Sequence, residues 1–439
     1  MTTATTLDHP GPGARRPGAG TRVADGAAIA VGLAIVFLVA HDGSFGWRVA
    51  RAVVVAAATA GLVLVLARHP GAGRRDPVGR GLAAVVSGLV GVAVGAGIAL
   101  PHLTKTGFTP VAVAGTVALA GGVVLVAAGG WWLLRGRRWW QWALVAVALV
   151  VALPVVVLPL GVAVAVTNVP RTSLDPDTPA DRGLDHEGVE MTTADGVTLR
   201  GWYVPGDSGA AVVLAHGAGS TRSGVLDQAV VLAQHGFGVL AFDARGHGES
   251  DGRAMDFGWY GDEDVAAAVS FLADQPGVDP GRIGAVGMSM GGEQVIGAAA
   301  ADDRIAAVVA EGAEARVAGD GDWLTDEYGA GGWVQQRIDR LTFGLTDLLT
   351  EAGPPATLHD ATAAAAPRPM LLIAAGDEAD EGHAARHIRS ASPGTVDVWV
   401  VPGAGHTGGL DTAPDEWERR VTAFLSGALG QPGDDRTAG

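Results

Sequence analysis

The sequence predicts two structurally different halves, an all-α transmembrane bundle followed by an α/β domain with a mostly parallel sheet and helices on both faces. Nearly all long apolar runs of the 439-residue chain lie before Val166, whereas most acidic residues lie after it. From Val189 onward, short apolar runs typical of buried strands alternate with longer runs at helical spacing. The change in pattern predicts that the two halves fold as separate units.

Five apolar runs make up the first half. Each is close to the roughly 20 residues that cross a ~30 Å hydrocarbon core. The expected spans are Ala24–Ala40, Val49–Ala67, Gly81–Leu100, Pro110–Leu134 and Ala143–Val166. A buried core helix is the alternative for any one run, but five in succession favour a membrane region. The first run is the shortest, so four spans remain an alternative to five.

The charges between these runs predict their orientation. Arginines concentrate before the first run and in every second loop after it, at Arg15, Arg16, Arg22, Arg68, Arg74, Arg75, Arg80, Arg135, Arg137 and Arg138. The other loops hold Arg48 and Lys105. Since basic loops stay in the cytoplasm, five crossings place the second half outside it. We therefore expect a multi-pass protein of the cell membrane with an extracytoplasmic C-terminal domain.

Composition excludes several classes of function. The net charge is −16 and no basic stripe is present, so nucleic acid is not an expected partner. The chain has no cysteine, which removes disulfides and thiolate metal sites. It has no H-E-x-x-H motif or Asp/His cluster at ligand spacing, so neither a metal nor another cofactor is expected. No span carries an ionisable residue near its middle, which favours an anchor over a transporter.

A G-x-S-x-G pentapeptide, Gly287–Gly291, carries the strongest chemical signal. It lies between a strand-like run, Arg282–Val286, and a helix-like run, Gly292–Ala301. A serine hydroxyl becomes a useful nucleophile when it is exposed, oriented and next to a base. A sharp strand-to-helix turn provides that exposure for Ser289, and the flanking glycines let the chain make the turn.

Two further strand ends carry related motifs. The apolar run Ala211–Ala215 leads into an H-G-x-G loop, His216–Gly219. Such a loop points a backbone N–H at a developing oxyanion, and the residue after the serine supplies a second one. We expect these donors to be the amides of Ala218 and Met290. The next apolar run leads into the F-D-x-R-G-H-G-x-S stretch, Phe242–Ser250.

The last two predicted strands end in an acidic cluster and a histidine. Pro369–Ala375 leads into Asp377, Glu378, Asp380 and Glu381, and Val396–Val401 leads into a glycine-rich loop that contains His406. Serine, acid and histidine therefore follow separate strands in that chain order. From Val189 to about Leu429, these motifs resemble the α/β-hydrolase superfamily, close to its small serine esterase and peptidase branches.

The resemblance implies roles for individual residues. Ser289 is the expected nucleophile and His406 the general base, while His216 and His247 are expected to be structural. The acid departs from the family pattern, because the residue three places after Gly376 is Ala379. Counting from the start of the strand favours Glu378. The alternatives are Asp380, then Asp377, and also Glu311 at the end of the preceding strand.

The predicted organisation has five parts. Residues 1–23 form a disordered tail, 24–166 the transmembrane region, 167–188 a linker, 189–430 the hydrolase domain and 431–439 a second disordered tail. An insertion at about 312–366 has helix-like spacing from Trp333 to Leu349. It is expected to form a small helical lid that lines an acyl or aromatic pocket, with packing on the sheet edge as the alternative.

The expected function is that of a membrane-anchored serine hydrolase. It would cleave an ester, thioester or amide of a small-molecule acyl or peptide substrate through an acyl-enzyme. The lipid bilayer is the other expected partner. A serine peptidase like prolyl oligopeptidase is one alternative, and a catalytically inactive membrane sensor or scaffold is another. The intact serine, histidine and H-G-x-G loop argue against inactivity.

Overall fold

A computed structural model describes residues 19–39, 45–67, 77–253 and 255–430. The chain divides into two compact units. The helical unit comprises the residues up to Leu103 together with Gly107–Gly161, and the α/β unit comprises Thr104–Thr106 and the chain from Val162 onward. Most of the predicted tail 1–23, all of the tail 431–439 and the arginines at 15, 16, 68, 74 and 75 lie outside the described residues.

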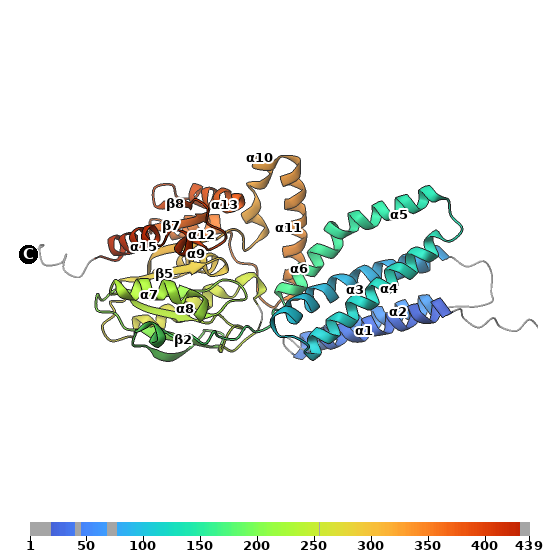
Figure 1. Ribbon diagram of the computed structural model, residues 1–439, viewed down its shortest axis with the longest axis horizontal. Helices are drawn as coiled ribbons and strands as arrows, with labels where there is room; N and C mark the ends of the chain where they lie inside the picture. The colour runs from blue at the N-terminus through green and yellow to red at the C-terminus, as the bar shows by residue number, and fades with distance from the viewer. Residues whose placement is uncertain (1–18, 40–44, 68–76, 254, 431–439) are drawn as a thin grey trace, which may run out of the picture. The chain divides into compact units, whose positions relative to one another are not determined.

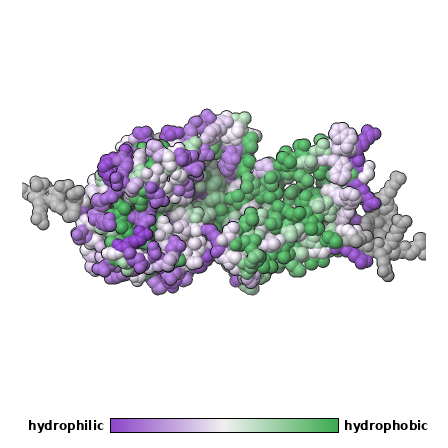
Figure 2. Space-filling view, viewed as in Figure 1, coloured by the Kyte–Doolittle hydropathy of each residue, from purple (hydrophilic) through white to green (hydrophobic). Residues whose placement is uncertain are grey.

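The first half is helical where it is described. Its helices are α1 (Ala19–Val39), α2 (Phe45–Ala67), α3 (Pro77–Lys105), α4 (Pro110–Leu134), α5 (Trp139–Ala152) and α6 (Leu158–Val166), the last two joined by a π-helical segment, η1 (Leu153–Val157). In this part of the chain, five helical stretches have the length and composition to cross a membrane (Figure 1). On the face seen in Figure 2, apolar side chains cover most of these helices. The five predicted apolar helices are confirmed.

Glycines bring α3 and α4 into close contact. A Cβ built on Gly95 would lie 2.2 Å from the Leu119 backbone nitrogen. One built on Gly122 would lie 2.6 Å from the backbone nitrogen of Val92. Residues without a side chain let two apolar helices approach until their backbones touch, which is how helices associate in lipid.

The α/β unit is built on one eight-stranded sheet with the order β1-β2-β4-β3-β5-β6-β7-β8. The strands are β1 (Glu187–Thr192), β2 (Thr198–Val204), β3 (Ala211–Ala215), β4 (Gly238–Phe242), β5 (Ile283–Met288), β6 (Ile305–Glu311), β7 (Met370–Ala375) and β8 (Val396–Val401). The hairpin β1–β2 is antiparallel and β2 pairs antiparallel with β4, whereas all later pairings are parallel. The parallel strands end at one edge, where the predicted motifs lie.

Helices cover both faces of this sheet (Figure 1). On one face the buried core includes residues of α8 (Gly261–Ala273), α9 (Met290–Ala301), α12 (Leu358–Ala365) and α13 (Ala379–Ser390). On the other face the core is closed by α7 (Leu226–Gln234), the short α14 (Gly409–Thr412) and α15 (Pro414–Leu429). Short 3-10 turns η2 (Pro179–Arg182), η3 (Arg222–Val225), η4 (Asp256–Gly258) and η5 (Ala318–Gly321) lie in the connections. This doubly covered sheet is the predicted α/β-hydrolase fold.

The insertion between β6 and β7 contains two helices besides α12. These are α10 (Leu324–Tyr328) and α11 (Ala330–Leu349). In α12, Leu358, Ala361 and Ala365 are fully buried in the sheet core. The helices α10 and α11, which lie within the insertion predicted at about 312–366, are called the cap below.

Candidate active site

Ser289 stands at a strained turn between β5 and α9. Its backbone has φ 53° and ψ −121°, a conformation that L-residues rarely adopt. A Cβ on Gly287 would lie 2.2 Å from the carbonyl oxygen of Gly291, and one on Gly291 would lie 2.4 Å from that of Ala215. Only glycine fits at either position. The pentapeptide is thus required by the backbone path that presents Ser289.

A line of hydrogen bonds joins Ser289 to a histidine and a buried carboxylate. The Oγ of Ser289 lies 2.8 Å from Nε2 of His406. Nδ1 of His406 lies 2.5 Å from Oε1 of Glu381. A carboxylate only accepts, so Nδ1 carries the proton and Nε2 is free to accept one from the serine.

The acid in this line is Glu381, whereas the sequence predicted Glu378. Glu378 is the exposed residue that precedes the first turn of α13. Glu381 lies in that first turn, is 1% exposed, and its second oxygen accepts a hydrogen bond from the Ala375 amide at 2.7 Å. The prediction placed the acid in a loop after β7, but the helix begins at Ala379 and carries the acid itself.

The three alternative acids also have other surroundings. Asp377 is exposed, and Asp380 accepts a hydrogen bond from the Tyr328 hydroxyl at 2.6 Å. Glu311 is buried and accepts from the Gly409 amide at 2.7 Å and the Trp417 indole at 2.8 Å. Glu311 therefore ties β6 to α14 and α15.

The carboxylate raises the pKa of His406. The hydrogen bond to Glu381 is the largest cause, and partial burial of the imidazole opposes it. A raised pKa means that the positive imidazolium is stabilised beside the carboxylate. This is the property required of a base that must hold a proton while a bond breaks.

The H-G-x-G loop lies directly against Ser289. A Cβ on Gly217 would be 3.2 Å from the Cβ of Ser289. Ala218 follows in this loop, and Met290 is the first residue of α9, where a backbone N–H has no intrahelical acceptor. Both predicted oxyanion donors therefore belong to segments that border Ser289.

Two buried histidines hold this loop in place. Nε2 of His216 accepts from the Ala244 amide at 3.0 Å, so its Nδ1 donates to the Gly217 oxygen at 2.8 Å. Nε2 of His247 accepts from the Gly219 amide at 3.2 Å. Burial lowers the pKa of each imidazole to about 4, which keeps both neutral near pH 7. Their contacts are those of structural residues, as expected from the sequence.

Buried ion pairs and hydrogen bonds hold the F-D-x-R-G-H-G-x-S turn in place. Asp243 accepts from the amide and the guanidinium of Arg222, each at 2.8 Å, and from the amide of Glu249 at 2.9 Å. Arg245 binds Asp264 at 2.7 Å. Sequence reasoning identified the motif but not its partners Arg222 and Asp264, because these two residues lie outside it in the chain.

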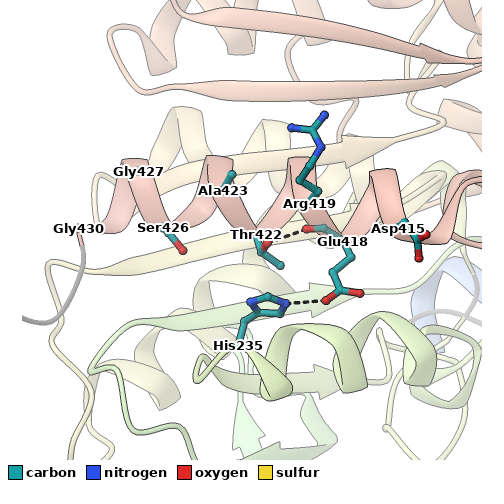
Figure 3. A pocket seen from close by; sticks show the side chains of 9 residues that line it. All are labelled: His235, Asp415, Glu418, Arg419, Thr422, Ala423, Ser426, Gly427 and Gly430. Carbon is teal, nitrogen blue, oxygen red and sulfur yellow. Dashed lines mark hydrogen bonds and ion pairs between the residues drawn. The ribbon is translucent and has the colours of Figure 1, made fainter.

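One surface groove lies apart from the candidate active site. A groove of about 840 Å³ lies on α15 beside His235 at the end of α7, where His235 bonds to Glu418 at 2.9 Å (Figure 3). None of Ser289, His406 or Glu381 lines it. Within the described residues, no group of three or more His, Asp or Glu side chains is placed to hold a metal ion.

Comparison with known proteins agrees with the fold and the motifs. The α/β unit of the chain has the α/β-hydrolase fold. Residues 206–342 match the family model described as serine aminopeptidase, S33.

Individual relatives are similar over shorter stretches. Thiohydrolase aneE of Aspergillus aculeatus is 41% identical over 125 residues, which are 28% of this chain and 39% of that protein. Polyketide transferase grgF of a Penicillium species is 35% identical over 131 residues, 29% of this chain and 45% of that protein. The chain thus spans less than half the length of either relative. A solved esterase of Pyrococcus furiosus, Pf2001, is 27% identical, with 60% of this chain and 99% of that chain covered and a TM-score of 0.49.

Proposed function

We propose that this protein is a membrane-anchored serine hydrolase that cleaves acyl esters, thioesters or amides through an acyl-enzyme. The observation that carries the proposal is the line Ser289–His406–Glu381, with hydrogen bonds of 2.8 Å and 2.5 Å. A nucleophile bonded to a base, which is in turn oriented by a buried acid, is the arrangement that activates serine on several unrelated folds.

In the proposed reaction, His406 Nε2 takes the hydroxyl proton as Ser289 Oγ attacks the acyl carbonyl carbon. The amides of Ala218 and Met290 stabilise the negative oxygen of the tetrahedral intermediate. His406 then protonates the leaving alcohol, thiol or amine, and an acyl-enzyme remains on Ser289. A water molecule, deprotonated by His406, releases the acid. Glu381 holds the imidazole in the tautomer that each step requires.

The comparisons leave the choice of leaving group to experiment. The relatives include a thiohydrolase, a name that points to thioesters, whereas the family model is named for an aminopeptidase. The test is labelling of the full-length protein by a fluorophosphonate, followed by turnover of matched acyl esters, thioesters and aminoacyl amides. Labelling and turnover of at least one substrate class are expected. An unlabelled, correctly folded protein would identify an inactive sensor or scaffold instead.

The anchoring part of the proposal rests on the five long apolar helices. With the arginine-rich loops in the cytoplasm, five crossings leave the hydrolase unit outside. Alkaline phosphatase fused after Gly439 should therefore be active in a bacterial host, and a fluorescent cytoplasmic reporter at the same point should be dark. The reverse pattern would place the enzyme in the cytoplasm.

A further inference from the structure

Helix α11 of the cap carries apolar side chains on its outer face. Val334, Ile338, Leu341, Leu345 and Leu348 recur every three or four residues and so form one stripe, here called the apolar seam. Val334 is 49% exposed, Leu341 40% and Leu348 67%. A surface helix normally turns such a stripe toward the core, so α11 has the reverse orientation.

The opposite face of α11 is the one that packs on the α/β unit. A Cβ on Gly332 would lie 1.8 Å from the Leu324 carbonyl oxygen. Gln336 donates to the carbonyl oxygens of Gly321 and Asp322, each at 3.0 Å, and Phe343 packs on Phe257 with ring centroids 4.6 Å apart. These contacts fix the helix with the seam pointing away from its own unit, and no described residue of that unit covers Leu348.

The chain that enters the α/β unit is fastened beside the active site. Apolar helix α6 ends at Val166, and the oxygen of the next residue, Thr167, accepts from Arg253 at 2.9 Å. The hydroxyl of Thr172 donates to the oxygen of Gly219 in the H-G-x-G loop at 2.9 Å. Six residues of extended chain reach at most about 20 Å. Thr172 is therefore no farther than this from the end of the apolar helix, it contacts the H-G-x-G loop directly, and all three belong to the same compact unit.

The segment Met255–Tyr260 connects this attachment to the cap and to the nucleophile. Asp256 lies 3.8 Å from Arg253, the arginine that holds Thr167. Phe257 packs on α11, and a Cβ on Gly258 would lie 2.8 Å from Cγ of Met290, the residue after Ser289. Asp256 and Phe257 have φ of 44° and 52°, a strained conformation that tends to persist at functional sites. This short segment therefore connects the attachment of Thr167, helix α11 and the residue that follows Ser289.

From this juxtaposition we propose that the apolar seam rests in the surface of the lipid bilayer, and that the substrate is a long-chain acyl ester taken from that bilayer. The inference rests on the proposed hydrolase function and names its substrate class. Ser289 would attack the ester carbonyl, the alcohol would leave with a proton from His406, and water would release the fatty acid. The apolar chain of the substrate would pass from lipid to Ser289 without crossing water, which lowers the cost of extracting it.

A bilayer fits the seam better than a second copy of the chain does. A stable protein interface buries roughly 800 Å² on each partner, more than the partly exposed seam of one helix offers. Trp333 lies beside the seam at 51% exposure, with the Arg337 guanidinium 5.1 Å from its ring. Tryptophan and arginine flanking an apolar stripe are typical of helices that lie in a membrane interface.

Because the chain has no cysteine, a single one can report the position of the seam. Leu348→Cys in the full-length protein would carry an environment-sensitive fluorophore in vesicles of phosphatidylcholine and phosphatidylglycerol. Val400→Cys is the matched control, since Val400 is 41% exposed on β8. Quenching by spin-labelled lipid at position 348 and not at 400 is expected. Equal quenching at both positions, or a disulfide-linked dimer through position 348 without quenching, would overturn the proposal.

Turnover separates this inference from the proposed function. The double variant Leu341→Gln/Leu348→Gln should lose at least roughly tenfold in kcat/KM on a long-chain ester embedded in the vesicles. Its turnover of a short-chain ester dissolved in water should stay within about twofold, as should both activities of Val400→Gln. Equal loss on both esters, or no loss on either, would overturn the inference. A wild-type protein that turns over neither ester would contradict the proposed function itself.

Discussion

The ends of strands β5 and β7 both deliver a residue of the candidate active site, but they do so in different ways. At β5 the path of the backbone fixes the position of Ser289, because a Cβ on Gly287 or Gly291 would lie within 2.4 Å of a neighbouring carbonyl oxygen. At β7 the contact is made by a long side chain, because Glu381 lies within a helix and reaches His406 from there. A backbone requirement leaves a fixed spacing in the sequence, whereas a side chain can reach the same point from several positions.

The largest expected effect is on the nucleophile. Ser289→Ala removes the only atom that can form the acyl-enzyme in the proposed mechanism, so kcat should fall by about 10⁶. The fold should survive, since Ser289 is partly exposed and alanine is smaller. Circular dichroism is the control. A substantial residual turnover by this variant would mean that another residue is the nucleophile.

The comparison of the two strand ends is sharpened by a matched pair of acid variants. Glu381→Gln keeps the shape of the residue and removes its charge, so kcat should fall by roughly 10²–10⁴. Glu378→Gln, three residues away and exposed, should stay within about twofold of wild type. If the two variants were reversed in rank, the acid would lie in the loop after all.

The backbone requirement at β5 can be tested through stability. Gly291→Ala forces a methyl group against the Ala215 carbonyl oxygen, so we expect a loss of more than about 3 kcal/mol and a clearly lower melting temperature. Gly344→Ala in α11, where nothing lies within 4 Å of the new Cβ, should be neutral or stabilising by up to about 1 kcal/mol. Similar melting temperatures for the two variants would show that the turn at Ser289 is not constrained.

The smallest expected effect is a shift in pH dependence. Turnover requires neutral His406, so kcat/KM should fall as the pH drops below the pKa of this residue. Glu381 raises that pKa by stabilising the imidazolium. In Glu381→Gln the acid limb of the kcat/KM profile should therefore move to lower pH, in addition to the loss of rate. If the acid limb did not move, the group that titrates in it would not be influenced by Glu381.

The sequence predicted most of the fold, and it named two of the three residues that the structure joins by hydrogen bonds, Ser289 and His406. The helix-length apolar runs, the alternating strands and helices, and the G-x-S-x-G pentapeptide are local patterns with direct physical causes. Glu381 was missed because the sequence alone does not show where the loop after β7 ends and the next helix begins. One signal was present: Glu381, Ala384, Ala385 and Ile388 recur at helical spacing and form the buried face of α13. A carboxylate in register with an apolar helix face indicates a buried acid.

The cap shows a second limit of sequence reasoning. The spacing of Trp333 to Leu349 predicted a helix, and α11 is that helix. The same apolar stripe also suggested a lining for the pocket, because amphipathic helices usually bury their apolar face. In the structure the packed face is formed by Gly332, Gln336 and Thr346. Which face of a helix packs depends on tertiary contacts such as the fit of Gly332 against Leu324, and periodicity does not contain that information.

The central claim, that Ser289 forms an acyl-enzyme through His406 and Glu381, is tested most directly by trapping that intermediate. Full-length protein is mixed with a slowly hydrolysed activated ester, quenched in acid, digested and examined by mass spectrometry. The account predicts an added acyl mass on the peptide that contains Ser289, and a much slower formation of that adduct in Glu381→Gln than in Glu378→Gln. An acyl group on a different residue, or ester turnover with no adduct and no dependence on Glu381, would contradict it.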